Sequence, residues 1–307
     1  MGFVSGFLVL TGLIACLPFL AEWRRQPMGH ARQATAPGEI ADLPSGATHY
    51  RWAGRETDPV VVCIHGLSTP SFVFAATERS LVALGYRVLS YDLYGRGYSA
   101  RARGAQDLVF FMEQLDALLA DQGVADAFTL LGFSMGGQIA TAFAARDDRV
   151  ERLVLVAPAG LADTAGMAPG WVWSAPIIGD WTMRVFGGIW LRRELVEHTS
   201  IATVIPDFED RQAAETGMRG YLPALLSSRR HVLDHPNIED YRQVARRRQP
   251  VMAIWGAADP VIPRRAMSGL ARLNPDAQHV EIKGAGHNLL QTHPSEVAAA
   301  LKAFLVA

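Results

Sequence analysis

The segment that decides the fold is Phe128–Gly137, which reads FTLLGFSMGG. Its first four residues form a largely apolar run that predicts a buried β-strand, and helical periodicity begins at Gly136. Between the two stands Gly-Phe-Ser-Met-Gly, residues 132–136, a Gly-x-Ser-x-Gly pattern in which a sharp turn exposes the serine hydroxyl at the end of a strand. The flanking glycines leave room for the strand and the helix to approach closely. The segment therefore predicts a strand–turn–helix unit that presents Ser134 as a nucleophile.

Short strand-like runs and helical segments alternate around this unit. The predicted strands, several of them continuous Val/Ile/Leu runs typical of parallel strands covered on both faces, are His49–Arg51, Val60–Ile64, Arg87–Tyr91, Phe128–Leu131, Leu153–Val156, Val251–Trp255 and His279–Ile282. The predicted helices are Ser71–Leu84, Leu108–Gln122, Gly136–Arg146, Arg264–Leu273 and Ser295–Leu305. This alternation predicts an α/β fold, with a mostly parallel twisted sheet flanked by helices, built from residues 47–160 and 250–307.

The alternation breaks between residues 161 and 249. This stretch has helical periodicity without a convincing central strand, and it holds four of the seven tryptophans: Trp171, Trp173, Trp181 and Trp190. Such an insertion can pack a small core of its own, and it can also cover an active site with an apolar inner surface. We expect a helical cap that does both.

A serine hydroxyl needs a general base, and the base needs an acid that orients it. His287 follows the last predicted strand in a glycine-flanked loop, whereas His279 starts that strand and His293 precedes a proline at a helix start. Asp259 follows the penultimate strand, although an Asp before Pro is also a common turn residue. Nucleophile, acid and histidine follow one another in the expected chain order, so we predict a Ser134-Asp259-His287 triad.

The loop after the strand Val60–Ile64 is expected to supply one backbone amide for an oxyanion, and the residue after the nucleophile the other. These donors are Leu67 and Met135. His65 is expected to orient the loop rather than to act as a base. The segment Asp92–Ser99 is expected to shape a turn at the edge of the site.

Composition excludes several other functions. The 307 residues carry a formal net charge of -1, which argues against nucleic acid as a partner. The sequence contains neither paired cysteines nor a His-Glu-x-x-His motif, the patterns that would predict a metal site. No Gly-x-Gly-x-x-Gly follows the first strand, so we expect no cofactor. The oligomeric state stays open.

The N-terminus is apolar, since residues 3–21 carry no charge. Nineteen helical residues rise about 28 Å, close to the hydrocarbon thickness of a bilayer. We expect residues 1–26 to be a single-pass anchor in a membrane, such as a bacterial inner membrane, followed by a linker over residues 27–46. A cleaved signal peptide, a lipoprotein signal ending at Cys16 and a buried helix are the alternatives. Arg24, Arg25 and Arg32 favour a cytoplasmic body by the positive-inside rule, but three residues leave the side of the membrane open.

Five ordered motifs resemble those of the α/β-hydrolase superfamily. They are His65-Gly66, Asp92-x-x-Gly95-x-Gly97-x-Ser99, Gly132-Phe133-Ser134-Met135-Gly136-Gly137, Gly256-x-x-Asp259-x-x-x-Pro263 and Gly286-His287. The resemblance covers about residues 47–307 apart from the insertion. Within the superfamily the chain looks most like the branch of monoacylglycerol lipases, lysophospholipases and carboxylesterases, some of which carry an N-terminal membrane anchor.

The resemblance implies hydrolysis of acyl esters through an acyl-enzyme, with lipid-like substrates such as monoacylglycerols or lysophospholipids. Carbon–carbon bond hydrolases and cofactor-free perhydrolases or haloperoxidases share much of the pattern and are alternatives on small soluble substrates. Epoxide hydrolases and haloalkane dehalogenases use an Asp nucleophile, so Ser134 argues against both. A hydrolase-fold protein that only binds a ligand is the remaining alternative.

Overall fold

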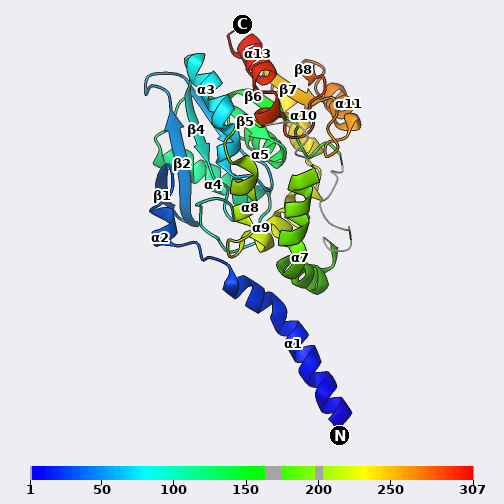
Figure 1. The fold of residues 1–307 in the computed structure, drawn as a ribbon. Helices are drawn as coiled ribbons and strands as arrows, with labels where there is room; N and C mark the ends of the chain where they lie inside the picture. Colours follow the sequence, from blue (N-terminus) through cyan, green and yellow to red (C-terminus); the bar gives the residue numbers. More distant parts are fainter. Residues whose placement is uncertain (1, 163–169, 171–173, 198–202, 307) are drawn as a thin grey trace.

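We describe the protein from a computed structural model, in which residues 2–162, 170, 174–197 and 203–306 are described (Figure 1). A central sheet with helices around it forms the body. The N-terminal helix α1, Gly2–Arg24, projects away from this body.

The sheet has eight strands in the order β1-β2-β4-β3-β5-β6-β7-β8. The two pairs that involve β2 are antiparallel, and all the others are parallel. The bounds of the strands are β1 Glu39–Leu43, β2 Gly46–Ala53, β3 Val60–Ile64, β4 Arg87–Tyr91, β5 Phe128–Phe133, β6 Val150–Val156, β7 Val251–Gly256 and β8 Gln278–Ile282. The predicted α/β fold with a mostly parallel sheet is confirmed.

Helices flank the sheet in two groups of neighbours. The first group is α4 Leu108–Asp121, α5 Met135–Ala144 and α10 Ile238–Arg246; the second is α3 Ala75–Ala83, α12 Leu289–Thr292 and α13 Pro294–Leu305. The 3₁₀ turn η1, Ser71–Phe74, precedes α3, and α11, Arg264–Leu273, connects β7 to β8. Because helices cover the sheet, every residue of β5 is buried, which explains why that strand is apolar without alternation.

The prediction of a linker over residues 27–46 is wrong for its second half. Glu39–Leu43 forms β1, which pairs with β2 at the edge of the sheet, and His30–Gln33 forms the short helix α2. In β1 only Ala41 and Leu43 are buried. Two inward apolar residues in a five-residue edge strand make too weak a periodic signal for recognition from sequence.

The insertion contains α7 Pro176–Glu197, α8 Phe208–Glu215, α9 Tyr221–Ser228, the π turn η2 Arg229–Leu233, and α10. A small apolar cluster joins α7 and α9, with Met183, Leu191, Leu222 and Leu225 among its buried members, and Leu67 packs against it. Trp181 is not among the buried members of this cluster, and its indole donates to the Ile14 carbonyl oxygen of α1 at 2.8 Å. Trp171 and Trp173 lie outside the described residues.

The end of the insertion belongs to the main body and not to a cap, contrary to the boundary expected at residue 249. Val232, Tyr241 and Val244 are buried in the main core. The Tyr241 hydroxyl donates to the Ala159 carbonyl oxygen at 2.7 Å. A physical reason is topological: β6 and β7 are parallel neighbours, so the chain must cross over the sheet, and α10 completes that crossover.

The last turn of α1 and the residues just after it are bound to the segment between α8 and α9. The Gln26 amide donates to the Gly217 carbonyl oxygen, and the Gly220 amide donates to the Glu22 carboxylate, at 2.9 and 2.8 Å. Val4–Arg24 is apolar and long enough to cross a membrane, a property that it shares with signal sequences.

Candidate active site

Ser134 stands in a strained turn between β5 and α5. Its φ of 54° and ψ of −118° lie where L-residues are rare. Three backbone hydrogen bonds hold the turn: the Ser134 amide donates to Val156, and the amides of Gly137 and Ala159 donate to the Ser134 carbonyl oxygen, at 2.9, 2.9 and 3.0 Å. The turn therefore has the geometry that the Gly-x-Ser-x-Gly pattern predicts.

The glycines of the motif are there because backbone segments approach too closely for a side chain. A Cβ at Gly132 would lie 2.3 Å from the Gly136 carbonyl oxygen, and one at Gly136 would lie 2.0 Å from the Ile64 carbonyl oxygen. Strand β5, helix α5 and the end of β3 thus meet at the serine.

The structure brings Ser134 together with His287 and Asp259, which lie in loops at least 125 residues further along the chain. His287 Nε2 lies 3.0 Å from Ser134 Oγ, and His287 Nδ1 lies 2.8 Å from Asp259 Oδ2. An ionised carboxylate can only accept, so Nδ1 carries the proton, and Nε2 is left to accept from the Ser134 hydroxyl. This is the tautomer that a general base needs.

Asp259 is held in its ionised form. Burial favours the neutral acid, yet the hydrogen bonds from His287 and from the amides of Ile262 and Val261 hold the pKa of Asp259 below its ordinary value. Its Oδ1 accepts from these two amides at 2.9 and 2.7 Å, which fixes the carboxylate in place.

Backbone contacts tie together the two loops that carry the acid and the base. The Ala258 amide donates to the Ala285 carbonyl oxygen at 2.9 Å. A Cβ at Gly256 would lie 2.4 Å from the Gly286 carbonyl oxygen, so a glycine is needed there for the loops to meet. His279, by contrast, stacks on Trp255 and accepts a hydrogen bond from its indole at 3.1 Å, so its contacts are structural.

The loop after β3 passes directly beside the serine. A Cβ at Gly66 would lie 3.2 Å from Ser134 Cβ. Leu67 follows in this loop, and within the described residues its amide donates no hydrogen bond, so it is available to a ligand. Met135 is the first residue of α5, where helical amides lack an intrahelical acceptor.

His65 is buried and has both ring nitrogens occupied. Nε2 accepts from the Leu93 amide at 2.9 Å, so Nδ1 carries the proton and donates to the Gly66 carbonyl oxygen at 2.8 Å. Burial lowers the pKa of His65 to about 4. The residue is thus a neutral support of the loop.

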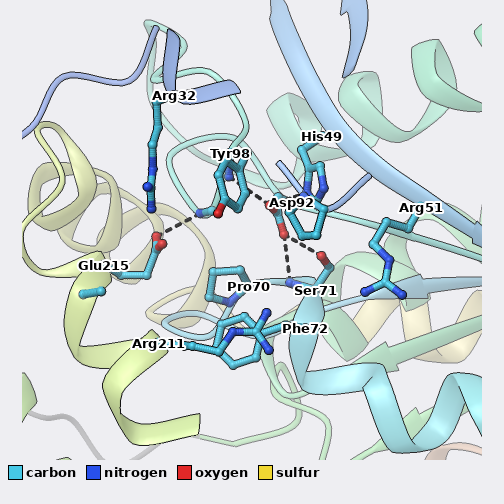
Figure 2. A pocket seen from close by; sticks show the side chains of 13 residues that line it. Arg32, His49, Arg51, Pro70, Ser71, Phe72, Asp92, Tyr98, Arg211 and Glu215 are labelled. Atoms are coloured by element: carbon cyan, nitrogen blue, oxygen red, sulfur yellow. Dashed lines mark hydrogen bonds and ion pairs between the residues drawn. The ribbon is translucent and has the colours of Figure 1, made fainter. Parts of the chain in front are cut away.

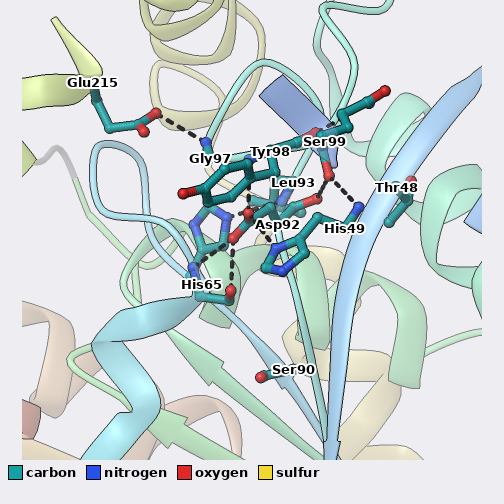
Figure 3. A network of polar contacts seen from close by, with 12 residues as sticks. Thr48, His49, His65, Ser90, Asp92, Leu93, Gly97, Tyr98, Ser99 and Glu215 are labelled. Carbon is teal, nitrogen blue, oxygen red and sulfur yellow. Dashed lines mark hydrogen bonds and ion pairs between the residues drawn. The ribbon is translucent and has the colours of Figure 1, made fainter. Parts of the chain in front are cut away.

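Asp92 organises the turn that follows β4 (Figure 3). Its carboxylate accepts from the Ser71 amide and hydroxyl, the Tyr98 amide and His49 Nδ1, at 2.9, 2.6, 2.9 and 2.7 Å. Burial opposes ionisation, but these partners hold the pKa of Asp92 well below its ordinary value. The hydrogen bonds to its carboxylate all come from the protein, so Asp92 acts as a structural anion of the turn.

Arg96 is a supporting residue that the sequence analysis missed. Its side chain is fully buried and donates from Nε to the Leu67 carbonyl oxygen at 2.9 Å and from Nη2 to Ser228 Oγ at 2.8 Å. Burial lowers the pKa of Arg96 to about 9, which leaves the guanidinium charged at neutral pH. One side chain thus connects the loop beside Ser134 to the end of α9.

Residues 61–300 match the alpha/beta hydrolase family, and the chain belongs to this family. It is 29% identical over 263 residues to the biotin biosynthesis bifunctional protein BioHC of Teredinibacter turnerae, covering 80% of this chain but only 44% of that longer protein. It is 25% identical over 278 residues to the pimeloyl-(acyl-carrier protein) methyl ester esterase of Aliivibrio fischeri, covering 84% of this chain and 98% of that one.

A solved structure of a membrane phospholipase A has a TM-score of 0.69 at 21% identity, covering 99% of this chain and 96% of that one. Other similar proteins include a haloalkane dehalogenase, a bromoperoxidase and an enol-lactonase. The similarities therefore establish the fold and the family, and they do not select a substrate.

Proposed function

We propose that the protein is a serine hydrolase that cleaves carboxylic esters through an acyl-enzyme. The observation that carries the proposal is the continuous chain from Ser134 Oγ to His287 and Asp259, with distances of 3.0 and 2.8 Å. The strained turn at Ser134 and the esterase among the relatives support it.

In the proposed reaction Ser134 Oγ attacks the ester carbonyl while His287 Nε2 takes its proton. The Leu67 and Met135 amides stabilise the oxyanion, and Asp259 stabilises the imidazolium. His287 then gives its proton to the leaving alcohol. Water, activated by the same base, releases the carboxylic acid and restores Ser134.

We further propose that the ester is lipid-like, such as a monoacylglycerol or a lysophospholipid, presented at a membrane in which α1 is anchored. Helix α7 packs against α1 and leaves Ile177, Ile178 and Ile189 at 85%, 62% and 53% exposure. Exposed apolar patches of this kind mark contact surfaces for membranes or proteins. Because α7 packs against α1, these side chains add to the exposed apolar residues of α1, which supports a bilayer as the place of the substrate.

A substrate panel tests the reaction and the lipid separately. The panel contains p-nitrophenyl esters of short and medium acyl chains, monoacylglycerols and lysophospholipids, each with wild type and Ser134→Ala. We expect wild type to hydrolyse both the soluble and the lipid esters, and Ser134→Ala to lose this activity. Equal rates for the two proteins would overturn the mechanism, and activity confined to short soluble esters would remove the lipid substrate alone.

A variant that lacks residues 2–20 tests the anchor. It keeps Glu22 and Gln26, which form hydrogen bonds with residues 217–220 of the body. We expect its kcat/KM on a soluble ester to match wild type, and its rate on monoacylglycerol in vesicles to fall by about tenfold or more, because the local concentration of enzyme at the bilayer is lost. An unchanged vesicle rate would contradict a role of α1 in presenting the substrate.

A further inference from the structure

A hollow of about 120 Å³ lies beside the turn that Asp92 organises, and Ser134, His287 and Asp259 are not among the described residues that line it (Figure 2). Three arginines from three different elements line this hollow: Arg32 of α2, Arg51 of β2 and Arg211 of α8. Figure 2 shows them on three sides of Asp92 and Ser71, with His49 close by, and these three other side chains are buried. The hollow therefore has a polar buried floor and a cationic rim.

Two of the three arginines have no anionic partner. Arg51 pairs with Glu78 at 3.4 Å. Arg32 lies over the Tyr98 ring at 5.1 Å and Arg211 over the Phe72 ring at 3.9 Å. Within the described part of the chain, neither guanidinium makes an ion pair or a side-chain hydrogen bond. Their N–H donors are thus available to a ligand.

The acidic groups at the hollow attract these arginines but make their close contacts with other groups, among them Arg101, which lies 3.9 Å from Glu215. Asp92 already accepts from Ser71, Tyr98 and His49. Glu215 accepts from the Gly97 amide at 2.9 Å, and burial raises its pKa above the ordinary value. Burial lowers the pKa of Arg211 and the nearby charge of Arg51 adds to this effect, whereas Tyr98, Asp92 and Asp207 oppose it. An anion between Arg51 and Arg211 would favour the charged form of both arginines.

We propose that this hollow is a binding site for inorganic phosphate or a phosphate monoester, held by the forked guanidinium groups of Arg32 and Arg211 with Arg51 adding positive charge. Guanidinium forks match the geometry of phosphate oxygens and bind them with two hydrogen bonds each. The ligand is either free phosphate or a lipid with a phosphomonoester headgroup. The site does not depend on the reaction proposed for Ser134.

Calorimetric titration of the full-length protein in detergent with inorganic phosphate tests the site. We expect saturable binding to wild type at constant ionic strength, and affinity weaker by about tenfold or more in the double variant Arg32→Gln/Arg211→Gln. Arg103→Gln is the matched control, since Arg103 is exposed and does not line the hollow, and it should bind as wild type does. Thermal unfolding without phosphate shows that each variant is folded, and the single variants replace the double one if it is not.

Absence of saturable binding to wild type, or equal affinity in wild type and the folded Arg32/Arg211 variants, would overturn the proposal. Phosphatidylcholine vesicles with and without phosphatidic acid distinguish the two sources of the ligand. Displacement of bound phosphate by phosphatidic acid, dependent on Arg32 and Arg211, assigns a lipid headgroup. Phosphate binding without such displacement assigns a soluble phosphate.

Discussion

His65 and His287 lie in two different loops, and their partners give them different chemistry. His287 has one nitrogen fixed by Asp259 and the other directed at Ser134 Oγ. His65 has both nitrogens bound to the backbone, at the Gly66 carbonyl oxygen and the Leu93 amide. The first can exchange a proton with a substrate, whereas the second can only hold its loop in place.

His65 should also affect the pH dependence of stability. Its pKa of about 4 in the folded state lies below the ordinary 6.5, so between these values the unfolded chain binds a proton that the folded chain does not. The free energy of unfolding therefore decreases as pH falls from 6.5 towards 4. The decrease that His65 causes between pH 7.5 and 5.5 is about 1 kcal/mol. Urea unfolding at both pH values measures it.

The variant His65→Asn serves as the comparison, because its amide can donate to a carbonyl oxygen and does not titrate. We expect the difference in unfolding free energy between wild type and His65→Asn to shrink at pH 5.5. A difference that is the same at both pH values would contradict a neutral, buried His65.

At the scale of elements, Arg96 connects three parts of the molecule: the loop after β3, the turn after β4 and the end of α9. Its bond to the Leu67 carbonyl oxygen fixes the peptide of the loop whose amide is proposed to bind the oxyanion. Its bond to Ser228 Oγ fixes the same loop to the insertion.

Arg96→Met should lower kcat on a short p-nitrophenyl ester by about tenfold with little change in KM, because a loosened Leu67 amide stabilises the transition state less than it did. Ser228→Ala is the control, since it removes a contact of the guanidinium and leaves the bond to Leu67. Steady-state kinetics of both variants measure the effect. A rise in KM at unchanged kcat would show that Arg96 acts on substrate binding instead.

The elements differ in how far the sequence predicts them. Strands β3 and β4 begin and end where the pattern indicates, because each is a run of five residues rich in β-formers between turns. Strand β1 escapes prediction because only two of its residues face the core. Arg96 escapes because an arginine between Gly95 and Gly97 resembles a solvent-exposed turn residue. Its burial depends on Ser228, 132 residues further along the chain, and only the tertiary structure supplies that contact.

At the scale of the whole molecule, the apolar helix α1 and the turn that carries Ser134 are joined through the insertion. The last turn of α1 and the residues after it are bound to residues 217–220. The cluster between α7 and α9 reaches Leu67, and its neighbour Gly66 lies beside Ser134. The sequence predicts each end of this connection, namely an apolar helix and a nucleophile turn. The contacts between them depend on packing across long stretches of chain.

The central claim is that Ser134 is the nucleophile, and covalent labelling tests it most directly. Full-length protein in detergent is treated with a fluorophosphonate probe, and the adduct is located by mass spectrometry of its peptides. We predict one adduct on Ser134 in wild type, much slower labelling in His287→Ala, and none at this site in Ser134→Ala. Labelling of another residue in wild type, with p-nitrophenyl ester hydrolysis intact in Ser134→Ala, would contradict the account.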